Sequence, residues 1–127
     1  MGLFSIFLLM ILCHIIDDFV LQPICLSKLK QKSWWKENAP NSLYKDDYKV
    51  ALFIHSLSWS IIIILPFIFF ESVPWLVMAI FVALNCFIHY RIDDLKANEN
   101  KINLRQDQTA HFLQILMTFL GFIPFVA

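Results

Sequence analysis

Long runs of apolar residues, separated by shorter polar stretches, organise this chain. Four segments each hold about 20 largely apolar residues, which is the length a helix needs to cross a bilayer. They cover approximately residues 3–22, 50–70, 73–95 and 104–125. Late in the second segment, Pro66 is expected to kink or end the helix. The pattern predicts an all-α fold, in which one domain (1–127) forms a polytopic membrane protein with a four-transmembrane-helix bundle.

Polar residues recur at helical spacing inside three of these apolar segments. Each of the three carries a histidine and an aspartate four residues apart: His14 with Asp18, His89 with Asp93, and Asp107 with His111. Residues four apart lie on one face of a helix, so each pair presents an imidazole beside a carboxylate. The fourth histidine, His55, lies in the remaining segment. Ionisable groups are costly within a membrane, and they therefore indicate a functional site.

The distribution of positive charge predicts the orientation of the bundle. All ten Lys and Arg residues lie in or beside the connections at about 23–49 and 96–103. The positive-inside rule places these connections in the cytoplasm and both termini outside it. Because successive spans alternate in direction, the histidines and aspartates then all fall near the cytoplasmic ends. The sequence therefore predicts one polar His/Asp cluster near the cytoplasmic side.

Histidine nitrogens and carboxylate oxygens together suit a divalent transition metal such as Zn, Mn or Fe. Such an ion would also offset the cost of placing several carboxylates in a membrane. The residues expected to ligate the metal are His14, Asp18, His89, Asp93 and His111. In a competing arrangement, each aspartate only orients its neighbouring histidine and fixes its tautomer.

The other polar residues near these ends are assigned supporting or catalytic roles. Asp107 and His55 are candidates for the general base, and Lys96 is a candidate for holding substrate charge. Gln22, Gln108 and Asp17 are expected to contact the ligands. An alternative interpretation places Asp17, like Asp94, at the solvated cytoplasmic rim.

Composition narrows the class of protein further. The chain is 59% hydrophobic with a mean hydropathy of +0.66, well above an ordinary soluble domain. Its formal net charge is zero, so a nucleic-acid partner is not expected. The three cysteines show no C-x-x-C spacing, which argues against a zinc ribbon or a redox motif. The expected partner is the lipid bilayer, and a homo-oligomer is a further option.

The polar motifs together resemble a known family. They are H-x-x-x-D-F-x-L-Q at 14–22, the isolated His55, H-x-x-x-D-x-x-K at 89–96, and D-Q-x-x-H at 107–111. This combination, spread over most of the chain, resembles the DUF3307 domain family of bacterial and phage integral membrane proteins. The resemblance implies a bacterial inner membrane location and marks these polar positions as the family's signature. Two departures are Asp17, where a small residue is expected, and Asp94, where an apolar one is expected.

Three functions compete at this point, because the family name carries no activity. The first is a metal-dependent hydrolase that acts on a phosphorylated or lipid-linked substrate at the cytoplasmic leaflet. The second is a cation or proton transporter, which intramembrane His and Asp residues also mark. The third is a non-catalytic phage or bacterial membrane protein that binds a membrane partner, with the polar cluster holding the bundle together.

Overall fold

The computed structural model describes residues 2–22 and 24–126, and these residues fold into helices without any strand. The four long helical stretches are α1 (Leu3–Ile16) with its π-helical continuation η1 (Asp17–Leu21), α4 (Asp47–Phe70), α5 (Trp75–Ala97) and α6 (Leu104–Val126). Shorter helices lie between η1 and α4: α2 (Ile24–Leu29), α3 (Lys32–Asn38) and the 3₁₀ turn η2 (Ser42–Tyr44). Four helices are long and apolar enough to cross a membrane. The predicted all-α fold with four span-like helices is therefore confirmed.

The second long helix differs from the sequence expectation at its start and at Pro66. The second long helix begins at Asp47, before the predicted start near residue 50. It also continues through Pro66 to Phe70, so the proline does not end it. A helix can accommodate proline only by giving up one backbone hydrogen bond. Pro66 is buried against the bundle, where packing offsets that loss.

The bundle is divided along its length into an apolar half and a polar half. The apolar half contains a buried core of aliphatic and aromatic side chains: Ile6, Met10, Trp59, Ile63, Ile64, Phe67, Val73, Ile115 and Phe122. Within it the rings of Phe67 and Phe81 both stack on Phe122, with centroids 4.4 Å apart in each pair. The outward faces carry large exposed apolar side chains such as Phe4, Leu8 and Phe87. Such surfaces suit lipid rather than water.

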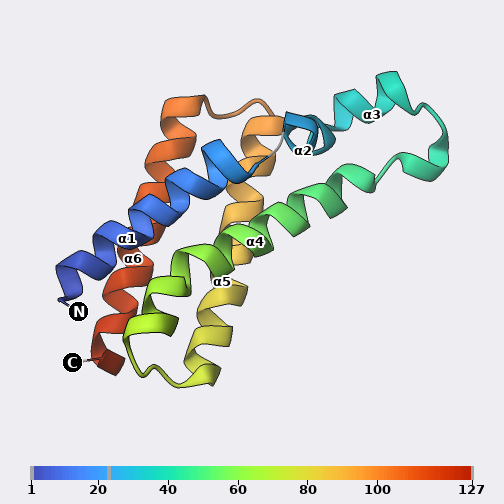
Figure 1. Ribbon diagram of the computed structural model, residues 1–127. Helices are drawn as coiled ribbons and strands as arrows, with labels where there is room; N and C mark the ends of the chain where they lie inside the picture. Colours follow the sequence, from blue (N-terminus) through green and yellow to red (C-terminus); the bar gives the residue numbers. More distant parts are fainter. Residues whose placement is uncertain (1, 23, 127) are drawn as a thin grey trace.

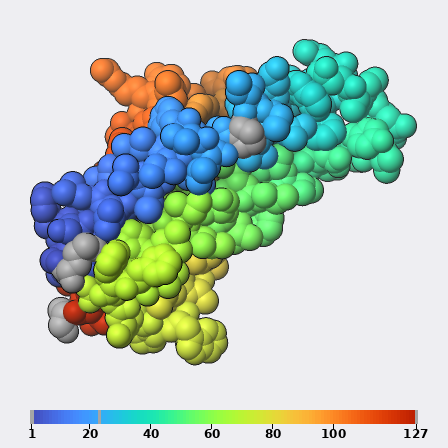
Figure 2. All heavy atoms as spheres, in the orientation of Figure 1, coloured from blue at the N-terminus to red at the C-terminus, as the bar shows by residue number. Residues whose placement is uncertain are grey.

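Both termini and the turn between α4 and α5 lie at one end of the bundle, whereas α2 and the connection between α5 and α6 lie at the other (Figure 1). The segment around α3 projects beyond the bundle (Figure 2). The side chain of Asn98, at the end of α5, ties the α2–α3 segment down. It donates to the Lys30 carbonyl over 3.1 Å and accepts from the Lys32 amide over 2.7 Å. These contacts fix the position of Lys30 over the polar half.

Candidate metal centre

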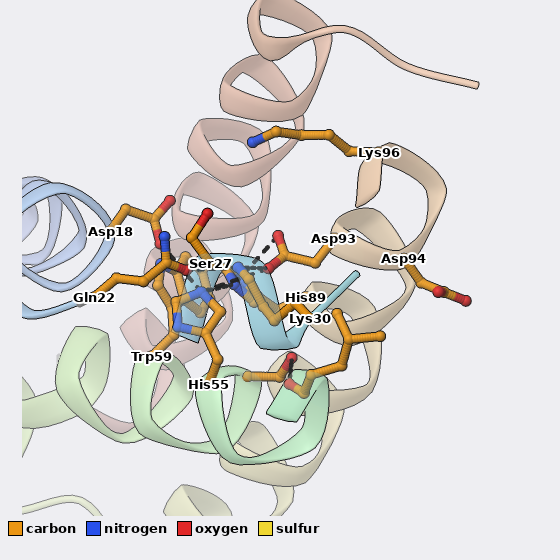
Figure 3. Close-up of polar contacts among 12 residues, drawn as sticks. Asp18, Gln22, Ser27, Lys30, His55, Trp59, His89, Asp93, Asp94 and Lys96 are labelled. Atoms are coloured by element: carbon orange, nitrogen blue, oxygen red, sulfur yellow. Dashed lines mark hydrogen bonds and ion pairs between the residues drawn. The ribbon is translucent and has the colours of Figure 1, made fainter. Parts of the chain in front are cut away.

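Four side chains from three different helices form the first part of the site. Asp18 comes from η1, His55 from α4, and His89 and Asp93 from α5, and they converge in Figure 3. Together with His111 from α6 they make two groups of candidate metal ligands that share His89. One group is Asp18, His55 and His89, and the other is His89, Asp93 and His111, with ligand atoms within 4.8 Å of one another in each.

The distances around His55 match those between ligands of a single ion. His55 Nε2 lies 3.2 Å from His89 Nε2, 3.4 Å from Asp18 Oδ1 and 3.5 Å from Asp93 Oδ2. In a tetrahedral zinc site with bonds of about 2.0–2.1 Å, the ligand atoms are about 3.3–3.4 Å apart. The donor atoms around His55 therefore have the spacing expected around a small cation.

The distances around His111 show the same spacing on the other side of Asp93. His111 Nε2 lies 3.4 Å from Asp93 Oδ1 and 3.5 Å from Asp107 Oδ1. His89 Nε2 is 3.7 Å from the same Asp93 oxygen. Asp93 thus directs one carboxylate oxygen toward His111 and the other toward His55. It occupies the central position of the cluster and can ligate on either side.

Several of these buried atoms have no hydrogen-bond partner among the described residues. They include Asp18 Oδ1, Asp107 Oδ1 and His111 Nε2. Buried polar atoms in proteins are nearly always hydrogen-bonded, so each exception requires an explanation. All three atoms face other candidate ligands at 3.4–3.5 Å. A cation held by the candidate ligand groups would give a partner to Asp18 Oδ1 or His111 Nε2, whereas Asp107 belongs to neither group.

The π-helical turn η1 explains why two adjacent aspartates both serve the site. Asp17 is only 3% exposed, so the interpretation that placed it at the solvated rim is wrong. Its Oδ1 accepts a hydrogen bond from Ser58 over 3.2 Å, and its Oδ2 lies 3.8 Å from His55 Nδ1. A carboxylate beside Nδ1 favours the tautomer whose Nε2 lone pair is free for a metal. Inserted π turns of this kind often occur at functional sites.

Asp94 behaves differently from Asp17 and does lie at the rim. It is partly exposed, accepts from Asn98 over 2.8 Å, and pairs with Arg91 at 3.3 Å. Its carboxylate belongs to neither group of candidate ligands. Asp94 is therefore a matched control for experiments on its neighbour Asp93.

Both ring nitrogens of His14 have protein partners. Trp59 donates to His14 Nδ1 over 2.9 Å, and His14 Nε2 lies 3.2 Å from Gln108 Oε1. Gln108 in turn donates to Asp18 over 3.3 Å and to Asp107 over 3.1 Å. His14 is fully buried, but it belongs to neither group of candidate ligands. The geometry thus favours His55 rather than His14 as a ligand. His14 instead contacts Gln108, which holds Asp18 and Asp107 by hydrogen bonds.

Two lysines contact the cluster, and only one of them was anticipated from sequence. Lys96 lies 2.7 Å from Asp107. Lys30 lies 2.6 Å from Asp93 and donates to Gln22 over 2.5 Å, so Gln22 contacts a lysine rather than a ligand. In sequence, Lys30 looks like any other lysine of a basic connection. The sequence patterns also did not single out Trp59 as a residue of the site. Its ring stacks on His89 with centroids 4.2 Å apart.

A family model described as "Protein of unknown function (DUF3307)" matches residues 6–126. The chain belongs to this family. No curated protein and no solved structure matched it. The DUF3307 resemblance rested on ten polar positions: His14, Asp18, Gln22, His55, His89, Asp93, Lys96, Asp107, Gln108 and His111. In the folded DUF3307 chain each of them contacts another polar member of the cluster or Lys30.

The polar cluster of this DUF3307 chain opens into a pocket. The pocket has a volume of about 290 Å³ and is lined by Lys30, Lys96, Asp93 and Gln22, among other residues. A second pocket of about 200 Å³ has these same four residues in its wall, together with Asp18. Of the candidate ligands, Asp93 and Asp18 therefore reach a pocket at the end that carries the basic connections, and the histidines are buried behind them.

Proposed function

We propose that this chain is an inner-membrane metalloprotein of bacteria that hydrolyses a phosphorylated or lipid-linked substrate at the cytoplasmic leaflet. The observation that carries the proposal is the pair of ligand groups sharing His89 beside a polar, accessible pocket. A site that only held the helices together would not need an opening lined by lysines. The proposal also requires that the pocket face the cytoplasm, which the positive-inside rule supports.

The charges of the cluster favour a divalent cation. With the histidines neutral, the four carboxylates of the cluster (Asp17, Asp18, Asp93 and Asp107) exceed its two ammonium groups (Lys30 and Lys96) by two negative charges. Unbalanced charge is costly in a buried, membrane-embedded site. One divalent ion balances it, so the expected content is one ion per chain. The mixed nitrogen and oxygen donors favour Zn, Mn or Fe over Ca²⁺.

A divalent ion held there would polarise a phosphoryl or acyl oxygen and lower the pKa of a water molecule. The protein supplies the remaining parts. Lys96 and Gln108 hold one oxygen of Asp107 over 2.7 Å and 3.1 Å, and its other oxygen has no hydrogen bond among the described residues. That free oxygen can accept a proton from water, so Asp107 remains our candidate for the general base.

The position of the cluster speaks against a pathway across the bilayer. Between the cluster and the termini, the buried core is formed by apolar residues such as Ile63, Phe67 and Phe122. Beyond the histidines, the buried polar residues Asn85, Gln114 and Thr118 bond to one another. A continuous polar route is thus absent from the described residues, and the hydrolase is favoured over the transporter.

The hydrolase is tested with Asp107→Asn, which keeps the shape of the side chain but removes its basicity. Loss of a general base typically lowers a rate about 10²–10⁴-fold. We expect a loss of this size in hydrolysis of phosphomonoesters and lipid-linked phosphates by the detergent-purified, metal-loaded protein. Asp94→Asn serves as the control and should retain wild-type activity. If the wild-type protein holds metal but cleaves no substrate across the screen, the non-catalytic alternative replaces the hydrolase.

The proposed orientation of the bundle, with both termini outside the cytoplasm, can be tested separately with reporter fusions. Alkaline phosphatase fused to the C-terminus should be active, and a fluorescent protein fused there should be dark, because both report on export from the cytoplasm. The same reporters inserted after Glu37, in the basic connection, should give the opposite result. A fluorescent C-terminal fusion would show that the bundle has the opposite orientation, with the polar pocket on the outer side.

A further inference from the structure

Two ammonium groups from separate parts of the chain meet at the pocket. Lys30 follows α2, and Lys96 lies in the last turn of α5 and extends over the cluster in Figure 3. Both line each of the two pockets that open from the cluster. The pockets therefore have positive charge on their walls, beside the candidate ligands Asp93 and Asp18.

Lys30 is unusually buried for a lysine, with 8% of its surface exposed. Lysines are almost never this buried unless they are paired. Asp93 and Gln22 account for two of the three N–H donors of Lys30. Lys96 uses one donor on Asp107. Three N–H donors of the two ammonium groups thus have no hydrogen-bond acceptor among the described residues.

The same two carboxylates that pair with the lysines also face the candidate metal ligands. Asp93 Oδ1 lies 3.4 Å from His111 Nε2, and Asp107 Oδ1 lies 3.5 Å from that same nitrogen. A cation bound at Asp93 would offset part of the negative charge of these two carboxylates. The three N–H donors of Lys30 and Lys96 without an acceptor among the described residues would then remain available to an anionic group in the pocket.

The rest of the pocket wall selects the class of ligand. Ser27, Gln31 and Asn100 add polar side chains, and the volume of about 290 Å³ accommodates a small head group rather than an acyl chain. Lysine ammonium groups bind phosphate well as point charges. Two of them beside a metal-binding cluster disfavour a cationic or purely apolar ligand.

We propose that Lys30 and Lys96 form a subsite for the phosphoryl group of the substrate. This subsite rests on the proposed function, because it places a phosphoryl group beside the candidate metal ligands. It assigns Lys30, which the sequence motifs did not single out, the role of a binding residue. The same chemistry fits a soluble phosphate ester and a phospholipid head group, and the experiment separates these sources.

The test measures binding by metal-loaded protein in detergent. Isothermal titration calorimetry with inorganic phosphate examines the soluble source, and native mass spectrometry with phosphatidic acid against phosphatidylcholine examines the lipid source. We expect at least one phosphoryl probe to bind, and both Lys30→Gln and Lys96→Gln to weaken it at least tenfold. Lys30→Arg, which keeps the charge, should recover part of the affinity. Lys28→Gln, an exposed lysine of the same segment, should bind within twofold of wild type.

The metal content of every variant is measured in parallel, so that the two proposals can fail separately. Wild-type protein that carries metal but binds neither probe would overturn the subsite and leave the metal site intact. Unchanged binding in both glutamine variants would also overturn it. If a protein without metal binds phosphate in a way that depends on Lys30 and Lys96, the result would support the proposed subsite and contradict the proposed metal-dependent function.

Discussion

We expect His89→Ala to remove nearly all bound divalent metal, to less than a tenth of the wild-type content per chain. His89 is the one residue common to both groups of candidate ligands, so its loss removes a ligand from each. His55→Ala should have a similar effect, because His55 Nε2 lies within 3.5 Å of donor atoms on three other side chains. Inductively coupled plasma mass spectrometry of the purified proteins gives the content directly.

His14→Gln is the informative comparison for these variants. Because both nitrogens of His14 already have protein partners, this variant should retain most of the metal. Asp94→Asn, at the rim, should retain all of it. Size-exclusion chromatography and thermal unfolding establish that each variant is folded. A folded His89→Ala protein with the metal content of the wild type would contradict the proposed site. The site would also be contradicted if His14→Gln lost all of its metal while His55→Ala retained it.

The second large effect concerns stability and the buried pair between Lys30 and Asp93. The two side chains are 10% and 7% exposed and 2.6 Å apart. Removing one partner of a buried pair leaves an uncompensated charge, which typically costs about 3–5 kcal/mol. We expect Asp93→Asn to lower the free energy of unfolding by about this amount, measured in the metal-free protein by denaturation in mixed micelles.

The double variant Lys30→Met/Asp93→Asn separates charge from packing. It removes both charges, so it should recover much of the stability that Asp93→Asn loses. The partly exposed pair between Asp94 and Arg91 provides the control, since exposed pairs contribute about 0–1 kcal/mol. A double variant less stable than Asp93→Asn would show that the ion pair is not the origin of the effect.

Much of the fold is evident from sequence because its main determinant is local. Runs of about 20 apolar residues define the long helices without reference to any distant contact. Helical spacing likewise groups each histidine with its aspartate, as for His89 and Asp93. The helix starts are less local, because the start of α4 at Asp47 depends on the path of the connection before it.

The division of roles within the site depends on contacts between helices and was not accessible from spacing. His14 and His55 look equivalent in sequence, but only the fold places Trp59 and Gln108 against His14. The burial of Asp17 follows from the π-helical turn, which the ideal helical period does not anticipate. Lys30 reaches Asp93 across 63 positions of sequence, through a connection that Asn98 holds in place.

The most direct test of the metal centre is X-ray absorption spectroscopy of the wild-type protein, with its metal content determined on the same sample. After incubation with Zn²⁺, Mn²⁺ or Fe²⁺ and removal of free ion, we expect one ion per chain. Its spectrum should show nitrogen and oxygen ligands, at about 2.0–2.2 Å for zinc, with the multiple scattering of imidazole. Protein that stays metal-free under all three conditions, or an ion without imidazole ligands, would contradict a His/Asp metal centre in this bundle.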